Sequence, residues 1–101
     1  MKRLIPKNLQ SVLWSQNIAS LDIEKDKTYI IHQIFSHGRM EDILWLFTVY
    51  PKTELENIFQ THPYKDYDAA RFNFVKNYLL RLRNKEINEQ RYVKNTPRDI
   101  R

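Results

Sequence analysis

The side chains of this chain that most often do chemistry are its three histidines, His32, His37 and His62. None of them stands in a His-Glu-x-x-His or similar spacing that would put two metal ligands on one helix face, and the chain has no cysteine. We therefore expect no metal site and no cofactor. We predict a solvated position for His32, a place for His37 beside the carbonyl end of a helix, and a loop position for His62.

Carboxylate pairs are the second candidate for chemistry. Glu41/Asp42 and Glu54/Glu56 fall in the first turns of predicted helices, where negative charge complements the helix dipole. No nucleophile or metal motif accompanies either pair, and the serines lack the surroundings of a nucleophile elbow. The sequence therefore predicts a protein that is not an enzyme.

Charge is distributed unevenly along the chain. Residues 71–101 carry nine Lys or Arg against three acidic residues, a net of +6, whereas residues 1–70 carry eight against nine, a net of −1. A basic region of this kind indicates an acidic partner, either a nucleic acid or an acidic protein surface.

Length and composition limit the class of protein. A chain of 101 residues is the usual size of one domain. The N-terminus lacks the pattern of a signal peptide, and no apolar run reaches the roughly 20 residues of a membrane span, so we expect a cytoplasmic protein without a membrane segment. The single glycine, Gly38, argues against phosphate-binding loops and dinucleotide-binding motifs.

Apolar periodicity predicts the elements that position these residues. We expect a short helix over 6–14, a helix from Asp22 to Gly38 with a one-sided apolar stripe, and a helix over 39–50 that is buried on several sides. The segment 53–56 is typical of a capping box at the start of a fourth helix. The longest helix is predicted over 69–83, with Tyr78 on its apolar arc and Leu80 on its polar arc.

The predicted fold is all-α: a small helical domain with a trihelical, helix-turn-helix-like core, a short N-terminal helix and a basic C-terminal helix or arm. We place the helical domain at residues 1–84 and the basic C-terminal extension at residues 85–101, where the apolar period fades. Thr96-Pro97 makes a continued helix unfavourable near the end.

Two kinds of binding surface are predicted. A DNA-binding regulator would use the exposed arc of the long helix, whose side chains are suited to base edges and phosphates: Asn73, Lys76, Asn77 and Arg81. A surface for a partner protein would use aromatic anchors and charged contacts: Trp45, Tyr67, Arg81, Arg83, Arg91 and Lys94. Trp45 is covered either by a neighbouring helix or by a partner, and an exposed aromatic surface would equally serve a homodimer.

A family resemblance bears on this choice. The chain has an Ile-Pro start, Trp14, a Lys-x-x-Ile-Ile-x-x-Ile helix from Lys27, then Gly38 and a Trp-Leu-Phe-x-x-Tyr helix from Trp45. This pattern over roughly residues 5–80 resembles a small uncharacterised bacterial helical domain family, often encoded beside nucleotidyltransferase-like toxins of the abortive-infection type. The resemblance implies an antitoxin-like protein that binds and neutralises or regulates such a partner. The chain departs from the family pattern in the segment 66–70 and in its basic extension.

Overall fold

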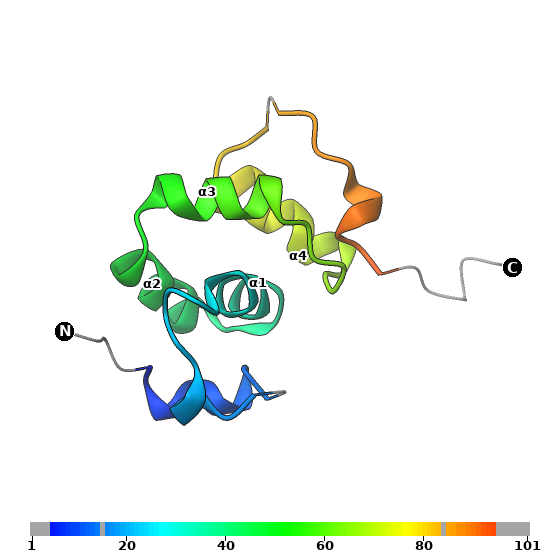
Figure 1. Cartoon of the computed structure of the whole chain (residues 1–101). Coiled ribbons are helices and arrows are strands. Elements are labelled where there is room, and N and C mark those ends of the chain that lie inside the picture. The colour runs from blue at the N-terminus through cyan, green and yellow to red at the C-terminus, as the bar shows by residue number, and fades with distance from the viewer. Residues whose placement is uncertain (1–4, 15, 84, 95–101) are drawn as a thin grey trace, which may run out of the picture.

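The computed structural model describes residues 5–14, 16–83 and 85–94, and over these ranges the chain is all-α, as predicted (Figure 1). The elements in order are η1 (Lys7–Ser11), η2 (Ile18–Ser20), α1 (Lys27–His37), α2 (Met40–Val49), α3 (Lys52–Thr61), α4 (Ala69–Asn73), η3 (Phe74–Leu79) and η4 (Glu89–Arg91). η1, η2 and η4 are 3-10 turns, and η3 is a π-helix that continues α4. No helix in the described part of the chain is long and apolar enough to cross a membrane.

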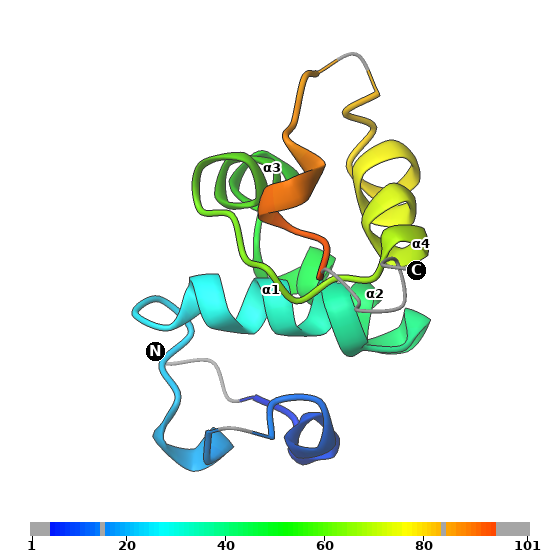
Figure 2. The ribbon, with the colours of Figure 1, turned by 90° about the vertical axis from the view of Figure 1, so that its right-hand side faces the viewer.

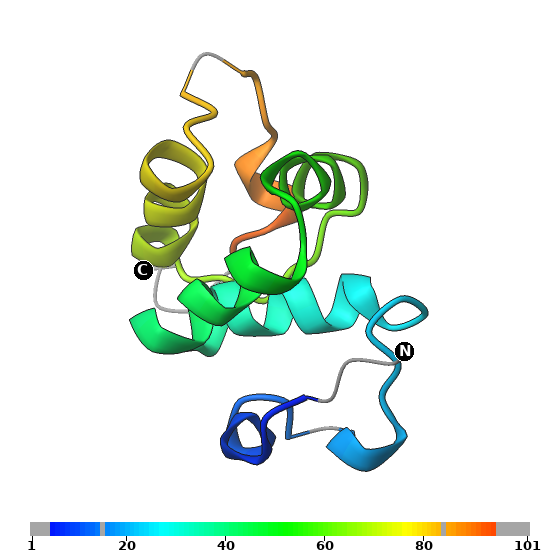
Figure 3. The ribbon, with the colours of Figure 1, turned by 90° about the vertical axis from the view of Figure 1, so that its left-hand side faces the viewer.

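Helix α1 lies at the centre of the domain and contacts α2, α3 and α4. Figure 2 shows the N-terminal segment on one side of α1, and α3 and α4 on the other. Seen from the opposite side, α2 runs beside α1 (Figure 3). Because neighbours surround α1, every residue from 30 to 36 is buried. The predicted one-sided stripe on this helix is therefore wrong.

The buried polar residues of α1, His32, Gln33 and Ser36, each have a hydrogen-bond partner, which offsets the cost of burying them. Gln33 donates to the backbone carbonyl of Val12 at 3.0 Å, which fastens the N-terminal segment to α1. Ser36 donates to the carbonyl of Gln33 within the helix. The hydrogen bond from Gln33 thus attaches the N-terminal segment to the core.

His32 is fully buried, so its predicted solvated position is wrong. Its Nε2 lies 2.7 Å from the carbonyl oxygen of His62, and its Nδ1 lies 2.7 Å from the hydroxyl of Tyr67. A carbonyl only accepts, so Nε2 carries the proton and Nδ1 of the neutral ring accepts from the Tyr67 hydroxyl. Burial lowers the pKa of His32 to about 4, which keeps the ring neutral.

Tyr67 is fully buried as well, so it cannot be the exposed anchor that the sequence predicts. Its ring lies in an aromatic cluster with Phe59, Phe72 and Tyr92. Its backbone amide and carbonyl bond to the segment of Tyr92 and Lys94, each at 2.9 Å, and form an isolated bridge. The hydroxyl is occupied by His32, and no face of the ring is left for a partner.

The C-terminal segment returns to the core between α3 and α4 (Figure 2). Tyr92 is buried against Phe59 of α3 and Phe72 of α4, and its hydroxyl donates to the Phe59 carbonyl. Tyr92 therefore belongs to the same hydrophobic core, with Ile87 and Val93 partly buried against it, while the predicted division at residue 84 stays a prediction. Residues 95–101 of the predicted extension lie outside the described residues.

The long helix predicted over 69–83 is interrupted. It forms one α-helical turn, α4, continues as η3 and ends at Leu79. The π-helical turn has more residues per turn than an α-helix, so it rotates the later side chains relative to an α-helical pattern. As a result Tyr78 is exposed and Leu80 is buried, the reverse of the prediction.

The helix starts differ from the predictions in two places. Asp22 accepts from the amides of Glu24 and Lys25 in a turn, and α1 begins five residues later, after Asp26. No capping box opens α3, which follows Pro51. Glu54 instead pairs with Lys27 at 2.5 Å and joins α3 to α1.

Gly38 ends α1, as predicted, but not through a left-handed conformation, because its φ is −76°. An added Cβ would lie 2.7 Å from the Ile34 carbonyl oxygen and 3.2 Å from Cβ of Asp42. The close passage from α1 into α2 therefore requires a glycine for reasons of space.

We predict that Gly38→Ala lowers the free energy of unfolding by about 1–3 kcal/mol, the usual cost of overpacking a buried site. Urea denaturation measures this change. If space were not limiting, alanine at this φ would stabilise the protein by about 0.4–1 kcal/mol through the unfolded chain, and that result would contradict the packing described here.

We predict that stability falls as the pH falls from 6.5 to 4. Because the pKa of His32 is about 4 in the fold and 6.5 in the unfolded chain, the unfolded state binds more protons in this window. The loss by pH 4 should be about 3 kcal/mol, measured by urea denaturation across the pH series. His32→Gln should flatten this dependence, whereas His62→Gln, at an exposed side chain, should retain it. Equal slopes in all three proteins would rule His32 out as the cause.

Candidate interaction surfaces

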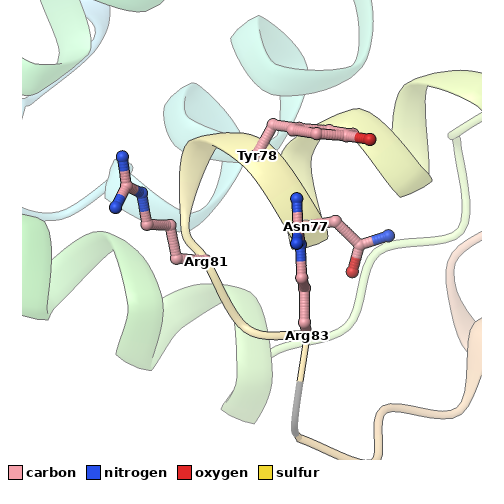
Figure 4. Close-up of a pocket in the computed structure, with 4 residues that line it drawn as sticks. All are labelled: Asn77, Tyr78, Arg81 and Arg83. Carbon is pink, nitrogen blue, oxygen red and sulfur yellow. The ribbon is translucent and has the colours of Figure 1, made fainter.

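A basic pocket lies at the end of η3. Asn77, Tyr78, Arg81 and Arg83 line this open depression of about 470 Å³ (Figure 4). Arg81 and Arg83 are exposed, and the guanidinium carbon of Arg83 lies 5.1 Å from the centre of the Tyr78 ring. This is a cation–π contact that leaves 62% of Tyr78 exposed.

The backbone around the pocket explains why both arginines project outward. Leu80 and Leu82 are buried in the core, and the arginines alternate with them. Arg81 has a φ of 54°, a left-handed conformation that glycine adopts more readily, and it is the one non-glycine residue with positive φ in the described ranges. The amides of Leu80 and Leu82 bond to the carbonyls of Val75 and Lys76 and close the end of η3.

The residues predicted for nucleic-acid binding do come together. The Asn77 amide donates to Oδ1 of Asn73, and Nζ of Lys76 donates to Oδ1 of Asn77, both at 3.3 Å. Arg81 does not continue their helix, although it lines the same pocket as Asn77. Sequence reasoning missed Tyr78, because the π-helical turn cannot be read from an apolar period.

The residues predicted for partner binding do not form one surface. Arg81 and Arg83 share the pocket, but Lys94 pairs with Asp66 at 2.9 Å and helps to hold the C-terminal segment. Arg91 is exposed on η4 and is not among the residues that line the pocket. Trp45 is half-buried on α2: the protein covers part of its side chain, and the rest is open to solvent.

The outer face of α2 forms a second surface, which we call the α2 face: Met40, Leu44, Trp45 and Phe47. Leu44 is 59% exposed and Met40 51% exposed, one helical turn apart. Phe47 and Trp45 of the same helix are half-buried, Trp45 roughly 100° round the helix from Leu44, while Ile43 and Leu46 face the core. The prediction that neighbours bury this helix on several sides is wrong, because α1 already occupies the centre of the domain.

His37 and Asp66 form a pairing that resembles an acid–base site. Nε2 of His37 lies 2.6 Å from Asp66, and Lys94 binds the other carboxylate oxygen. Burial alone would raise the pKa of Asp66, but the hydrogen bonds from Lys94 and His37 outweigh it and lower the pKa. The His37 side chain thus links α1 to the chain after α3, instead of meeting the carbonyl end of its own helix. The described residues hold no group of three or more His, Cys, Asp or Glu that could bind a metal ion.

Fold and surfaces together define a small all-α domain with an apolar helix face and a basic pocket. The model of a family of unknown function, DUF6922, matches residues 9–59, and the chain belongs to this family. The resemblance to an uncharacterised domain family is confirmed at this level. Comparison with curated proteins and with solved structures found no match.

We predict that Arg81→Gly raises the free energy of unfolding by roughly 0.5–1 kcal/mol, because glycine relieves the left-handed strain. Arg83→Gly removes the same charge two residues later, where φ is not positive, and should not stabilise the protein. Urea denaturation of both variants makes the comparison. Equal changes in the two variants would contradict a strained backbone at Arg81.

Proposed function

We propose that this protein is a noncatalytic interaction domain that binds a partner protein through the α2 face, in the manner of an antitoxin that neutralises or regulates its toxin. The observation that carries the proposal is the exposure of Leu44 and Met40, one turn apart on a helix that also carries half-buried Trp45. Large apolar side chains grouped at a surface favour burial against another protein.

The extent of the family match supports this choice of surface. The matched residues, 9–59, include all of α2, whereas the basic pocket at 77–83 lies beyond them. A binding function common to the family would have to use the matched segment. Among the described residues of this segment, the α2 face carries two large apolar side chains that are more than half exposed, Met40 and Leu44.

Charge favours a different protein as the occupant of the α2 face over a second copy of this chain. The net charge of +5 makes two copies repel each other and attracts an acidic partner. The partner proposed from the family resemblance is a nucleotidyltransferase-like toxin. It should present an apolar groove for α2.

The alternative is a small DNA-binding regulator, and one observation favours it. Asn73, Lys76 and Asn77 lie together on a partly exposed arc. The same helix is poorly suited to the major groove, however, because it consists of one α-helical turn followed by a π-helix and ends before Arg81. The geometry therefore supports the α2 face more strongly than a reading helix.

We predict that Leu44→Glu weakens a complex with the product of the adjacent gene at least about tenfold, since burying a leucine contributes about 1.5–3 kcal/mol. Co-expression followed by size exclusion with light scattering measures the stoichiometry, and titration calorimetry measures the affinity. The control is Gln60→Glu, which changes an exposed residue of α3 and should bind normally.

Two results would contradict the proposal. One is a complex whose affinity is the same for Leu44→Glu and the parent protein, both shown to be folded by urea denaturation. The other is a homodimer that Leu44→Glu dissociates, because it would assign the α2 face to self-association.

A further inference from the structure

We propose that the basic pocket binds one unstacked nucleotide of a single-stranded nucleic acid. In this arrangement Arg83, which lies against Tyr78, binds the phosphate of that nucleotide, and Arg81 binds a neighbouring phosphate of the strand. Tyr78 stacks on the base, and Asn77 contacts the edge of the base. The inference does not rest on the proposed partner protein, because it concerns a different surface outside the family-matched segment.

The two arginines are available for a phosphate. Within the described ranges, no carboxylate forms an ion pair with Arg81 or Arg83. Their alternation with buried Leu80 and Leu82 fixes their backbones to the core while their side chains project into solvent (Figure 4). Planar guanidinium groups bind phosphate oxygens well, and because the Arg81 side chain points away from Arg83 and Tyr78 (Figure 4), the two arginines suit separate phosphates of one strand.

Tyr78 makes a nucleotide a better ligand than an isolated anion. Its ring is 62% exposed, and the Arg83 guanidinium lies against it at 5.1 Å. An exposed aromatic ring beside a cation is the arrangement on which single-stranded nucleic acids stack their bases. Bases of a duplex are covered by their neighbours, so they cannot reach such a ring without unstacking.

Asn77 is oriented before any ligand binds. Its amide nitrogen donates to Asn73 and its oxygen accepts from Lys76, which leaves one N–H and one lone pair unused by these bonds. A side-chain amide held in this way suits the donor and acceptor groups of a base edge. Lys76, the neighbour of Asn77 in the chain, also lines a second depression with Lys85 and Glu86.

The conformation of Arg81 is a second, independent feature of the pocket. A left-handed backbone is most favourable for glycine, yet the position holds a cationic residue whose side chain lines the pocket. Strained residues of this kind concentrate at binding sites, where the surrounding structure holds them in place. Replacing Arg81 with glycine should therefore remove the phosphate contact while the fold is preserved or strengthened.

Fluorescence anisotropy with a labelled 15-nucleotide oligo(dT), an oligo(U) of the same length and a labelled duplex tests the proposal on the full chain. We expect both single strands to bind more tightly than the duplex, with affinity that falls as salt is raised. Tyr78→Ala should weaken single-strand binding at least about fivefold, and Tyr78→Phe should not. Arg81→Gly should weaken it at least as much without loss of stability in urea.

Two controls separate the pocket from general charge effects and from partner binding. Arg39→Ala removes an exposed arginine at the start of α2 and should change oligonucleotide binding little. Leu44→Glu, which tests the α2 face, should leave the effect of Tyr78→Ala intact. Equal affinity for duplex and single strand, or normal binding by Tyr78→Ala, would overturn the inference. Tighter binding of poly-glutamate than of either oligonucleotide would overturn it in favour of an acidic protein ligand.

Discussion

His32 donates a hydrogen bond to the carbonyl of His62 and accepts one from the hydroxyl of Tyr67, in the middle of a helix that is buried on every side. This arrangement lets α1 occupy the centre of the domain although it carries polar side chains. Among the described residues, no buried side-chain nitrogen or oxygen lacks a partner. The same two bonds fix the chain after α3, because both partners of His32 lie there. Tyr67 then aligns the segment of Tyr92 through its backbone.

The central position of α1 explains where the exposed surfaces lie. Its histidines serve the fold: His32 is hydrogen-bonded in the core, and His37 is paired with Asp66. α2 needs only one face to cover α1, so its other face presents Leu44 to solvent. Beyond η3, Leu80 and Leu82 are buried in the core, so Arg81 and Arg83, which alternate with them, project outward. Both surfaces are therefore consequences of how neighbouring elements cover one buried helix.

Much of the fold could be predicted from the sequence because it depends on local patterns. The helix over 40–49 and its ends follow from apolar periodicity, Gly38 and Pro51. The burial of α1 could not be predicted this way, because the partners of His32 lie 30 and 35 residues further along the chain. The polar side chains of this helix predicted a solvated face, whereas His32 and Gln33 are buried and form hydrogen bonds with residues distant in sequence.

The candidate sites were predictable to a smaller extent. The charge pattern indicated Arg81 and Arg83 as binding residues, and the structure brings them into one pocket. The sequence could not indicate Tyr78. A π-helical turn exposes Tyr78 and buries Leu80, and the spacing of the apolar residues does not reveal such a turn. The sequence also could not show that Tyr67 is buried, because the partner of its hydroxyl, His32, is distant in sequence.

The most direct test of this account is the protonation state of His32 in the folded protein. Long-range nitrogen–proton NMR spectra of the imidazole rings, recorded from pH 7.5 to 5, distinguish the two neutral tautomers from the charged ring. The structure predicts that His32 stays neutral with its proton on Nε2 throughout this range, consistent with a pKa of about 4. A His32 ring that becomes charged near pH 6.5, or that carries its neutral proton on Nδ1, would contradict the buried bonds to His62 and Tyr67.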